Sequence, residues 1–465
     1  MNSEPAPSQP LFNDVFDQDL ISKYDRTGPR YTSYPTALEL KEGFDNEDFI
    51  SAVKASPNQL LSIYIHLPFC HSLCYYCGCN KIVTRNQDKL HKYLDFLKQE
   101  IMQRASLFKS FEVSQIHFGG GTPSFLSIEQ LNDLLSYIER YFTLASNPEV
   151  SIEIDPRNIE LSYADELAKI GFNRISIGVQ DTNYEVQETI NRVQSTQFIR
   201  DLVDRAKRSG INSINLDLVY GLPKQTPDTF QNTLNDAVNI NPDRISLFSY
   251  AHMPSKFPAQ RKLPEQFIPT GSSKLELMKQ ALSYFCANGY EMIGMDHFAK
   301  PDDVLAKAKK NKTLGRNFQG YTVEETTDLL GLGLTSISTI GNTISQNTKS
   351  LNTYYQQFNQ KLHCIEKGLV LSSDDAIRRH VIKELMCNLY LNKTEVEDTF
   401  EIDFDDYFAS ELGALKEFVE DGLIELNNQD IKVYECARLF IRNICMCFDA
   451  YIKLKERQQR FSRII

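Results

Sequence analysis

The sequence predicts an α/β fold built around a barrel, complete or partial, of six βα units. From residue 60 onward, short runs of β-branched and apolar residues alternate with longer amphipathic stretches, the pattern of strands and helices around a parallel sheet. After about residue 370 long helical stretches follow one another, which indicates a second, mainly helical domain. In a barrel of this kind the functional site lies at the carboxyl ends of the strands.

The predicted strands are the six apolar runs, at residues 60–66, 114–118, 150–155, 174–180, 214–221 and 244–251. Amphipathic stretches between them predict helices, at residues 90–105, 128–142 and 229–240. A seventh candidate strand covers residues 290–299. Residues 317–341, which are rich in glycine and hydroxyl side chains, are interpreted as loops that close over a site.

The regions outside the barrel are expected to differ in character. Residues 1–58 contain "KYDRTGPRYTSYPTA", which has neither helical nor alternating periodicity and predicts an extended arm that covers the barrel. Long helical stretches are expected at residues 374–391 and 436–461. The predicted division is therefore an arm at 1–58, a barrel that carries the site at 59–345 and a helical domain at 346–465.

Composition limits the function classes. The chain has 465 residues, 42% of them hydrophobic, and contains no apolar run near the roughly 18 residues of a membrane span. A net charge of −11 argues against a nucleic-acid partner, which normally needs a broad basic surface. The first twenty residues contain no basic residue, so they resemble neither a signal nor a transit peptide. We expect a cytoplasmic protein whose ten cysteines are thiols or metal ligands.

Four cysteines lie within ten positions of "YIHLPFCHSLCYYCGCNK", directly after the first predicted strand. Structural zinc could use Cys70, Cys74, Cys77 and Cys79, although zinc ligands usually form two separated pairs. Buried thiols without a ligand are a second alternative, which the polar neighbours of this segment disfavour. The third is an iron–sulfur cluster, because CxxxCxxC supplies three soft thiolates to a [4Fe–4S] cube and leaves one iron open.

The CxxxCxxC spacing resembles the radical S-adenosylmethionine (SAM) signature. The blocks "GPRYTSYPTA", "GGGTPS", "GVQD", "DLVYGLPKQT", "YAHMP", "GMDHFA", "NFQGYT" and "RNICMCFD" further resemble the oxygen-independent coproporphyrinogen III oxidases and span nearly the whole chain. This resemblance implies a partial (βα)6 radical SAM barrel with an N-terminal arm and a helical C-terminal domain. It also implies that Cys70, Cys74 and Cys77 hold the cluster, while Cys79 is a further cysteine needed for turnover.

The resemblance implies two bound SAM molecules. Contacts to the SAM on the cluster are expected from four residues: Tyr64, Gly120, Glu153 and Ile337. Contacts to the second SAM are expected from seven: Tyr76, Gly121, Thr122, Gln180, Arg192, Asp217 and Ala251. Together with Cys79, His66 and Tyr64 are expected to take part in catalysis.

Without the resemblance, each of these features has a simpler explanation. "GGGTPS" would be a tight strand-to-helix turn, Glu153 and Asp217 would be solvated carboxylates, and Arg192 would be a surface helix residue. His66 would be a hydrogen-bonded core histidine. Cys445 and Cys447 are best explained by helical packing.

The implied reaction converts two of the four propionates of coproporphyrinogen III to vinyls and releases carbon dioxide. A reduced cluster cleaves SAM to a 5′-deoxyadenosyl radical, which abstracts a propionate β-hydrogen. Arg30, Arg316 and Gln319 are the expected anchors for substrate carboxylates. The reaction requires an electron donor and a terminal electron acceptor, and the sequence identifies neither. The family resemblance also implies a monomer.

Heme chaperones and heme-degrading relatives share the cysteine loop and form the alternative functions. The resemblance implies that chaperones lack a cysteine equivalent to Cys79, and that the "GPRYTSYPTA" arm belongs to the oxidases. A zinc-stabilised interaction protein would be a third class. Both Cys79 and the arm favour the oxidase.

Overall fold

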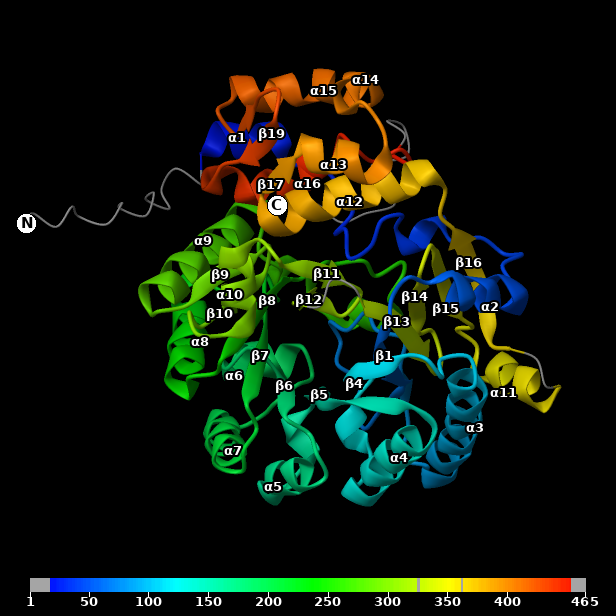
Figure 1. The fold of residues 1–465 in the computed structure, drawn as a ribbon. Helices are drawn as coiled ribbons and strands as arrows, with labels where there is room; N and C mark the ends of the chain where they lie inside the picture. Colours follow the sequence, from blue (N-terminus) through cyan, green and yellow to red (C-terminus); the bar gives the residue numbers. More distant parts are fainter. Residues whose placement is uncertain (1–16, 324–326, 361–362, 453–465) are drawn as a thin grey trace, which may run out of the picture.

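The computed structural model describes residues 17–323, 327–360 and 363–452. Within these residues the central sheet has twelve strands, in the order β16-β15-β14-β13-β1-β4-β5-β6-β7-β8-β10-β9. The strands from β13 to β8 in that order are all parallel, and they curve into the open barrel of Figure 1. Their bounds are Thr327–Leu332 (β13), Leu60–Leu67 (β1), Glu112–Gly120 (β4), Thr143–Ile154 (β5), Arg174–Gln180 (β6), Ser213–Tyr220 (β7) and Arg244–Ser249 (β8). The six predicted strands are thus confirmed.

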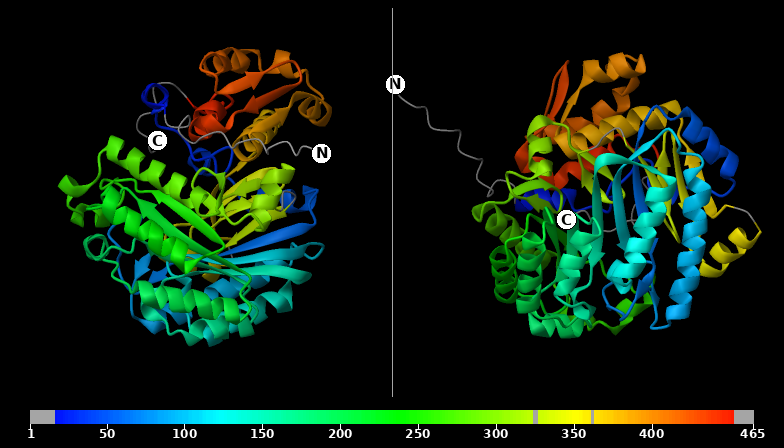
Figure 2. Two further views of the ribbon diagram at one scale, coloured as in Figure 1. Left: turned by 90° about the vertical axis from the view of Figure 1, so that its left-hand side faces the viewer. Right: turned by 60° about the horizontal axis from the view of Figure 1, so that its bottom comes forward.

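Helices cover the outer face of these strands (Figures 1 and 2). They are α3 (Gln87–Ala105), α4 (Ile128–Tyr141), α5 (Ser162–Lys169), α7 (Thr196–Arg208) and α8 (Pro227–Ile240). The short α6 (Tyr184–Thr189) instead packs at the strand ends, beside Tyr75 and Tyr76 of the cysteine loop. The start of α4 is fixed by a capping box between Ser127 and Gln130. Buried residues at the helical spacing, Leu131, Leu135 and Ile138, then pack α4 against the sheet.

Two predictions about the later strands are wrong. Residues 290–299 form an antiparallel hairpin of β9 (Glu291–Gly294) and β10 (His297–Ala299) instead of one strand. The described part of residues 317–341 includes three complete strands, β12 (Gly320–Thr322), β13 and β14 (Ile337–Ile340), instead of loops alone, and β13 pairs directly with β1. The glycines in this segment allow close approach, because a Cβ on Gly331 would lie 2.5 Å from the Ile337 carbonyl oxygen. Residues 324–326 of this segment lie outside the described residues.

Antiparallel strands extend the sheet beyond β14, with β15 (Thr343–Asn347) and β16 (Ile365–Val370). The sheet therefore continues past residue 345, and the division at 58 and 345 stays a prediction. The remaining elements of the barrel region are α9 (Gly271–Ala287), α10 (Val304–Asn311), α11 (Leu351–Asn359), β11 (Gly315–Asn317) and β12 (Gly320–Thr322). No helix within the described residues is long and apolar enough to cross a membrane.

The C-terminal domain is mainly helical, as predicted, and also contains a three-stranded antiparallel sheet. Its elements are α12 (Ser373–Asn388), α13 (Lys393–Phe400), α14 (Phe404–Tyr407), α15 (Ala409–Glu420), α16 (Ile441–Met446), β17 (Tyr390–Asn392), β18 (Ile424–Leu426) and β19 (Asp430–Val433). The long helical stretch expected at 436–461 is wrong for the part that the structure describes. A 3-10 helix, Glu435–Phe440, is followed there by the short α16. Residues 453–461 lie outside the described residues.

The N-terminal arm contains two helices, α1 (Gln18–Tyr24) and α2 (Asn46–Ala55), so the prediction of an arm without helical structure is wrong. Helix α1 lies against the C-terminal domain (Figure 1). There Tyr24 stacks on Phe418 at 4.8 Å between ring centroids and donates a hydrogen bond to Asp421. The arm therefore connects the barrel to the C-terminal domain.

A buried carboxylate on α3 holds the turn after β13. Glu100 is 1% exposed and accepts hydrogen bonds from the Gly333 amide, Asn347 Nδ2 and Tyr354 Oη, each at 2.7 Å. The thiol of Cys364 donates a fourth, at 2.9 Å. A buried acceptor with four donors connects four segments of the chain.

We predict that Glu100→Gln lowers the free energy of unfolding by about 2 kcal/mol or more, because an amide cannot accept from all four donors. Urea unfolding monitored by circular dichroism measures the change. The matched control is Glu139→Gln on the exposed side of α4, which we expect to change stability by no more than about 0.5 kcal/mol. Equal midpoints for wild type and Glu100→Gln would contradict the assigned role.

Candidate active site

The cysteine loop begins where β1 ends. It lies between two short parallel strands, β2 (Phe69–Cys70) and β3 (Ile82–Val83). Cys70 and Cys74 are buried, Cys77 is partly exposed and Cys79 is exposed. The four thiols thus run from the base of the loop outward to its surface.

Two of the three signature sulfurs accept hydrogen bonds, one from the turn after β4 and one from the cysteine loop itself. Thr122 Oγ1 donates to Cys70 Sγ at 3.3 Å, and the Cys79 amide donates to Cys77 Sγ at 3.4 Å. A hydrogen bond from the Cys79 thiol, with the charge of Lys81, lowers the pKa of Cys77 to about 6. Burial raises the pKa of Cys70 to about 11, so this thiol loses its proton only on binding a cation.

The third sulfur faces two guanidinium groups. Arg157 Nη2 and Arg192 Nη1 each donate to Cys74 Sγ at 3.4 Å, and both pair with Asp155, at 2.6 and 3.2 Å. Burial would raise the pKa of Asp155, but hydrogen bonds from Arg157 and the charge of Arg192 lower it to about 2. Asp155 therefore stays ionised and orients both arginines toward the sulfur.

These residues fit a [4Fe–4S] cluster. Three soft thiolates in one loop, each receiving hydrogen bonds, suit an anionic cluster whose sulfur ligands bind separate irons. Within the described part of the chain, no three His, Cys, Asp or Glu side chains converge as the ligands of a single metal ion would.

Beside the loop, Tyr64 and His66 project from the end of β1. The Tyr64 hydroxyl lies 3.1 Å from His66 Nδ1, and its ring stacks on His117 of β4 at 5.9 Å. Burial lowers the pKa of His66, which favours the neutral imidazole.

The Gly120 amide donates to Glu153 Oε2 at 3.2 Å, and Glu153 remains 42% exposed. Burial would raise the pKa of Glu153, but hydrogen bonds from His117 and Gly120 lower it, so the carboxylate is charged.

The glycines of "GGGTPS" are required by close packing. Gly120 has φ +114°, and a Cβ there would lie 2.7 Å from the imidazole of His66. A Cβ on Gly121 would lie 2.7 Å from the Pro68 backbone. The turn therefore places its backbone directly against the end of β1 and the start of the cysteine loop.

The other predicted SAM contacts lie around the same end of the barrel. Asp217 on β7 accepts from Ser176 Oγ at 3.0 Å and Asn215 Nδ2 at 2.9 Å, and Gln180 ends β6 with φ +66°. Ala251 follows β8, and Gln260 Nε2 donates both to its carbonyl and to that of Tyr76, at 3.2 and 3.0 Å. Ile337 begins β14, so the predicted contacts lie on most of the strands that surround the barrel opening.

The predicted substrate anchors are in two environments. Arg30 donates to Asp296 at 3.2 Å. Arg316 lies 4.6 Å from the ring centroid of Tyr321, and its buried Nε and Nη1 have no hydrogen-bond partner within the described residues. The buried Nε2 of Gln319 is likewise without a partner among those residues.

Sequence reasoning missed Asp155, Arg157 and Gln260. The first two had a signal, because "DPR" begins at the last residue of the predicted strand at 150–155, at the end of the barrel where sites lie. Nothing in the sequence marked Gln260, which acts from a 3-10 helix nearly two hundred residues after the cysteine loop.

The barrel and the cysteine loop define a radical SAM enzyme. A family model described as the Radical SAM superfamily matches residues 64–237, and one described as the HemN C-terminal domain matches residues 371–440. A [4Fe–4S] cluster and SAM are the cofactors that this class implies, which removes the zinc and unligated-thiol alternatives.

Two relatives with high sequence identity carry the same name. The chain is 49% identical to the oxygen-independent coproporphyrinogen III oxidase of Escherichia coli (strain K12), over 97% of this chain and 98% of that one. It is 44% identical to the Pseudomonas aeruginosa protein of that name, over 97% of this chain and 99% of that one. The solved structure titled "Coproporphyrinogen III oxidase (HemN) from Escherichia coli is a Radical SAM enzyme" matches with a TM-score of 0.91 and 48% identity, covering 94% of this chain and 99% of that one. The chain belongs to the oxygen-independent coproporphyrinogen III oxidase family.

We predict that Gly120→Ala weakens SAM binding and SAM cleavage at least tenfold while keeping the cluster, because the added methyl group displaces His66 and the neighbouring Tyr64. Visible absorbance measures the cluster, and titration with SAM measures binding. Gly171→Ala is the matched control, since Gly171 has φ +101° with no atom within 4 Å of an added Cβ. If both variants bound SAM equally well, the contact with His66 would not be the cause.

We also predict a pH-dependent stability difference for Asp217→Asn. Burial, together with the charge of Glu153, raises the pKa of Asp217 to about 6, so the folded protein keeps a proton that the unfolded chain has lost. The free energy of unfolding therefore falls as the pH rises from about 4 to 6, and the full loss persists above that range. The variant should be more stable than wild type by roughly 2–3 kcal/mol at pH 8, and should lose this advantage at pH 4. Urea unfolding at the two pH values is the test, and an equal difference at both would exclude ionisation of Asp217 as the cause.

Proposed function

We propose that this chain catalyses the oxygen-independent oxidative decarboxylation of coproporphyrinogen III to protoporphyrinogen IX in heme biosynthesis. Two of the four propionates become vinyl groups. Each loses carbon dioxide, a hydrogen atom and one further electron, so that charge and atoms balance. The observation that supports this most strongly is the cysteine loop with three hydrogen-bonded sulfurs and an exposed fourth thiol, in a chain whose relatives bear the name of this oxidase.

The residues at the end of the barrel supply binding and orientation. When bound, the reduced cluster and SAM supply a carbon radical able to remove a hydrogen from an unactivated carbon. Glu153 is charged and partly exposed, which suits acceptance of hydrogen bonds from a ribose or an ammonium group. With Tyr64, Gly120 and Ile337, it is assigned to the SAM on the cluster.

A second SAM is also part of the proposal. Its contacts are assigned to residues in the loops after β1, β4, β6 and β8 and on strands β6 and β7: Tyr76, Gly121, Thr122, Gln180, Arg192, Asp217 and Ala251. The bonds of Gln260 to the carbonyls of Ala251 and Tyr76 hold two of these segments together across the barrel opening. Arg192 already pairs with Asp155 and Cys74, so its contribution to SAM is shared with support of the cysteine loop.

Three side chains are assigned to the reaction itself. Cys79 is exposed at the outer end of the loop, and its hydrogen bond with Cys77 raises its pKa, which keeps it a thiol that can give or take a hydrogen. Burial raises the pKa of Tyr64, so its hydroxyl keeps a proton to share with neutral His66. These groups can position the substrate or move a proton beside it.

Substrate carboxylates are assigned to Arg30, Arg316 and Gln319. The buried donors of Arg316 and Gln319 lack partners within the described residues, and a buried donor without a partner is costly until a ligand accepts from it. A substrate carboxylate could accept from either group.

The proposal includes the arm at 1–58, the barrel at 59–345 and the helical domain at 346–465. It further includes a cytoplasmic, monomeric enzyme. An electron donor for the cluster and an acceptor for the second electron are required by the electron balance.

The anaerobically reconstituted protein, given SAM, a reductant and coproporphyrinogen III, should form vinyl product, detected as protoporphyrin fluorescence after oxidation. We predict that Cys79→Ser keeps the cluster absorbance but loses at least 99% of vinyl formation, because the exposed thiol is absent. Cys286→Ser, a partly exposed cysteine distant in sequence from the loop, is the control and should keep wild-type rates.

Failure of the wild-type protein to form vinyl product, with SAM cleavage or heme binding intact, would overturn the oxidase in favour of a heme-processing or chaperone function. Full activity of Cys79→Ser would refute only the role of this thiol and would leave the proposed reaction in place.

A further inference from the structure

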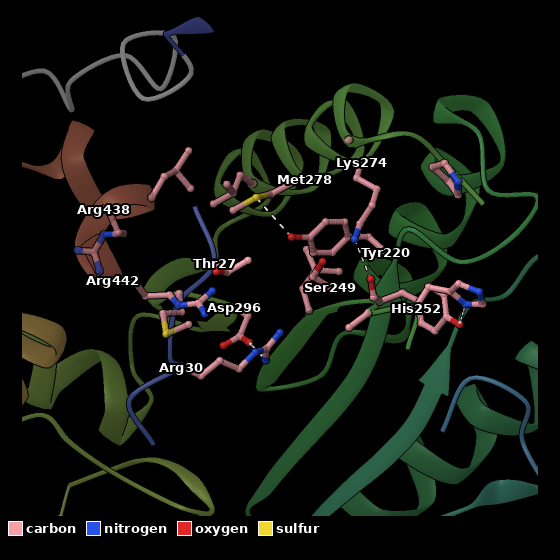
Figure 3. Close-up of a pocket in the computed structure, with 18 of the residues that line it drawn as sticks. Thr27, Arg30, Tyr220, Ser249, His252, Lys274, Met278, Asp296, Arg438 and Arg442 are labelled. Carbon is pink, nitrogen blue, oxygen red and sulfur yellow. Dashed lines mark hydrogen bonds and ion pairs between the residues drawn. The ribbon is translucent and has the colours of Figure 1, made fainter. Parts of the chain in front are cut away.

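A cavity of about 480 Å3 lies beside the ends of β7 and β8 (Figure 3). The ends of β7 and β8, the start of α9, the arm and the C-terminal domain surround it. Among the described residues that line it, four are Lys or Arg and one is acidic: Arg30, Lys274, Arg438 and Arg442 against Asp296. In a chain of net charge −11, this cavity is locally cationic.

Lys274 is placed there by the packing of α9 on the strand ends. Gly221, after β7, has φ +82°, and a Cβ there would lie 2.6 Å from Lys274 Cε. The lysine stem therefore crosses directly over the Gly221 backbone. The ammonium group donates to the Tyr250 carbonyl at 2.7 Å, and Figure 3 shows it beside Tyr220, within the cavity.

Arg30 is placed by the C-terminal domain. Arg442 Nε donates to the Pro29 carbonyl at 2.7 Å and also bonds the carbonyl of Gly28, which fixes the arm immediately before Arg30. Arg30 reaches Asp296 at 3.2 Å while its side chain remains 37% exposed, so it is accessible to a ligand.

The charge around Asp296 is not balanced. Asp296 also pairs with His297 at 2.8 Å, and it lies near Arg316 as well as Arg30. Burial and the neighbouring charge of Arg30 lower the pKa of Arg442 to about 9, although Asp296 acts in the opposite direction. Arg438 is already paired with the Glu435 carboxylate at 2.8 Å, which leaves Arg30, Lys274 and Arg442 against the single carboxylate of Asp296 in the lining. This excess of positive charge would be neutralised by a further anion.

The rest of the lining is largely apolar, including Met278, Leu282 and Phe298, with the hydroxyl groups of Ser249 and Tyr220 between the cations. A ligand that fits both properties has apolar ring edges and separate carboxylates. We propose that this cavity binds a pyrrole ring of the porphyrinogen that is not reacting, with Lys274 and Arg30 as anchors for its propionate. This inference rests on the proposed function and adds Lys274 as a residue that determines substrate affinity.

Ala251, a predicted SAM contact, lines the same cavity, so an aliphatic carboxylate could come from SAM instead. The test compares Lys274→Met, Arg30→Met, Lys274→Arg and the control Lys279→Met. Lys279 lies on the same helix, is exposed and does not line the cavity. For each protein, the affinity for coproporphyrin III is measured by fluorescence quenching without turnover. The KM for coproporphyrinogen III and the affinity for SAM are measured separately.

We expect Lys274→Met to weaken coproporphyrin binding and raise the KM about tenfold, the effect of one charge-assisted hydrogen bond, with SAM affinity unchanged. Lys274→Arg and Lys279→Met should stay close to wild type.

Unchanged porphyrin affinity and KM in both Lys274→Met and Arg30→Met would overturn the proposal. A loss of SAM affinity in place of porphyrin affinity would assign the cavity to SAM and also overturn it. If wild type bound coproporphyrin but formed no vinyl product, the proposed function would fail, whereas the binding comparison would still decide whether Lys274 anchors a carboxylate.

Discussion

Three thiolates in a single short loop concentrate negative charge where the barrel is mostly buried, and the surrounding strands are arranged to stabilise it. Thr122, after β4, donates to the sulfur of Cys70. Arg157 and Arg192, after β5 and β6, donate to the sulfur of Cys74. These strands follow β1 in the sheet order, so parallel pairing brings each donor to the same end. Asp155 holds both arginines in place and limits the excess of positive charge that they would otherwise create.

A second requirement is that the backbone approach this loop closely. At Gly120 and Gly121 the strand-to-helix turn after β4 lies against His66 and Pro68, where a side chain would have no room. Behind β1, Tyr93 of α3 donates to the His66 carbonyl at 2.7 Å and accepts from the Leu334 amide at 2.9 Å. The end of β1 is therefore held from both sides, and the His66 ring also contacts the Asn80 carbonyl of the cysteine loop at 3.4 Å.

The sequence was sufficient for the six central strands, because parallel strands covered by helices are nearly continuous apolar runs, and three of the connections between them were recognisable as amphipathic helices. It also marked the cysteine loop by its spacing. It failed for β13, where glycines that permit close strand contact were interpreted as loop residues. It also failed for α1 and α2, whose stability comes from caps and packing more than from apolar periodicity. Arg192 could not be distinguished from a surface residue, since its partners Asp155 and Cys74 are distant in the sequence and meet only in the folded barrel.

The pairing of β1 with β13 has a consequence for how the chain acquires its structure. Strand β1, which leads into the cysteine loop, pairs with two strands. One of them, β4, follows it closely in the sequence, whereas the other, β13 (Thr327–Leu332), is more than two hundred residues away. During synthesis from the N-terminus, β1 therefore remains an open edge until most of the barrel has left the ribosome, and contacts between such distant segments form slowly. An unpaired edge can recruit other chains. For this protein, the period before β13 pairs with β1 is when nascent chains would be most prone to aggregate through the segment that bears the catalytic loop.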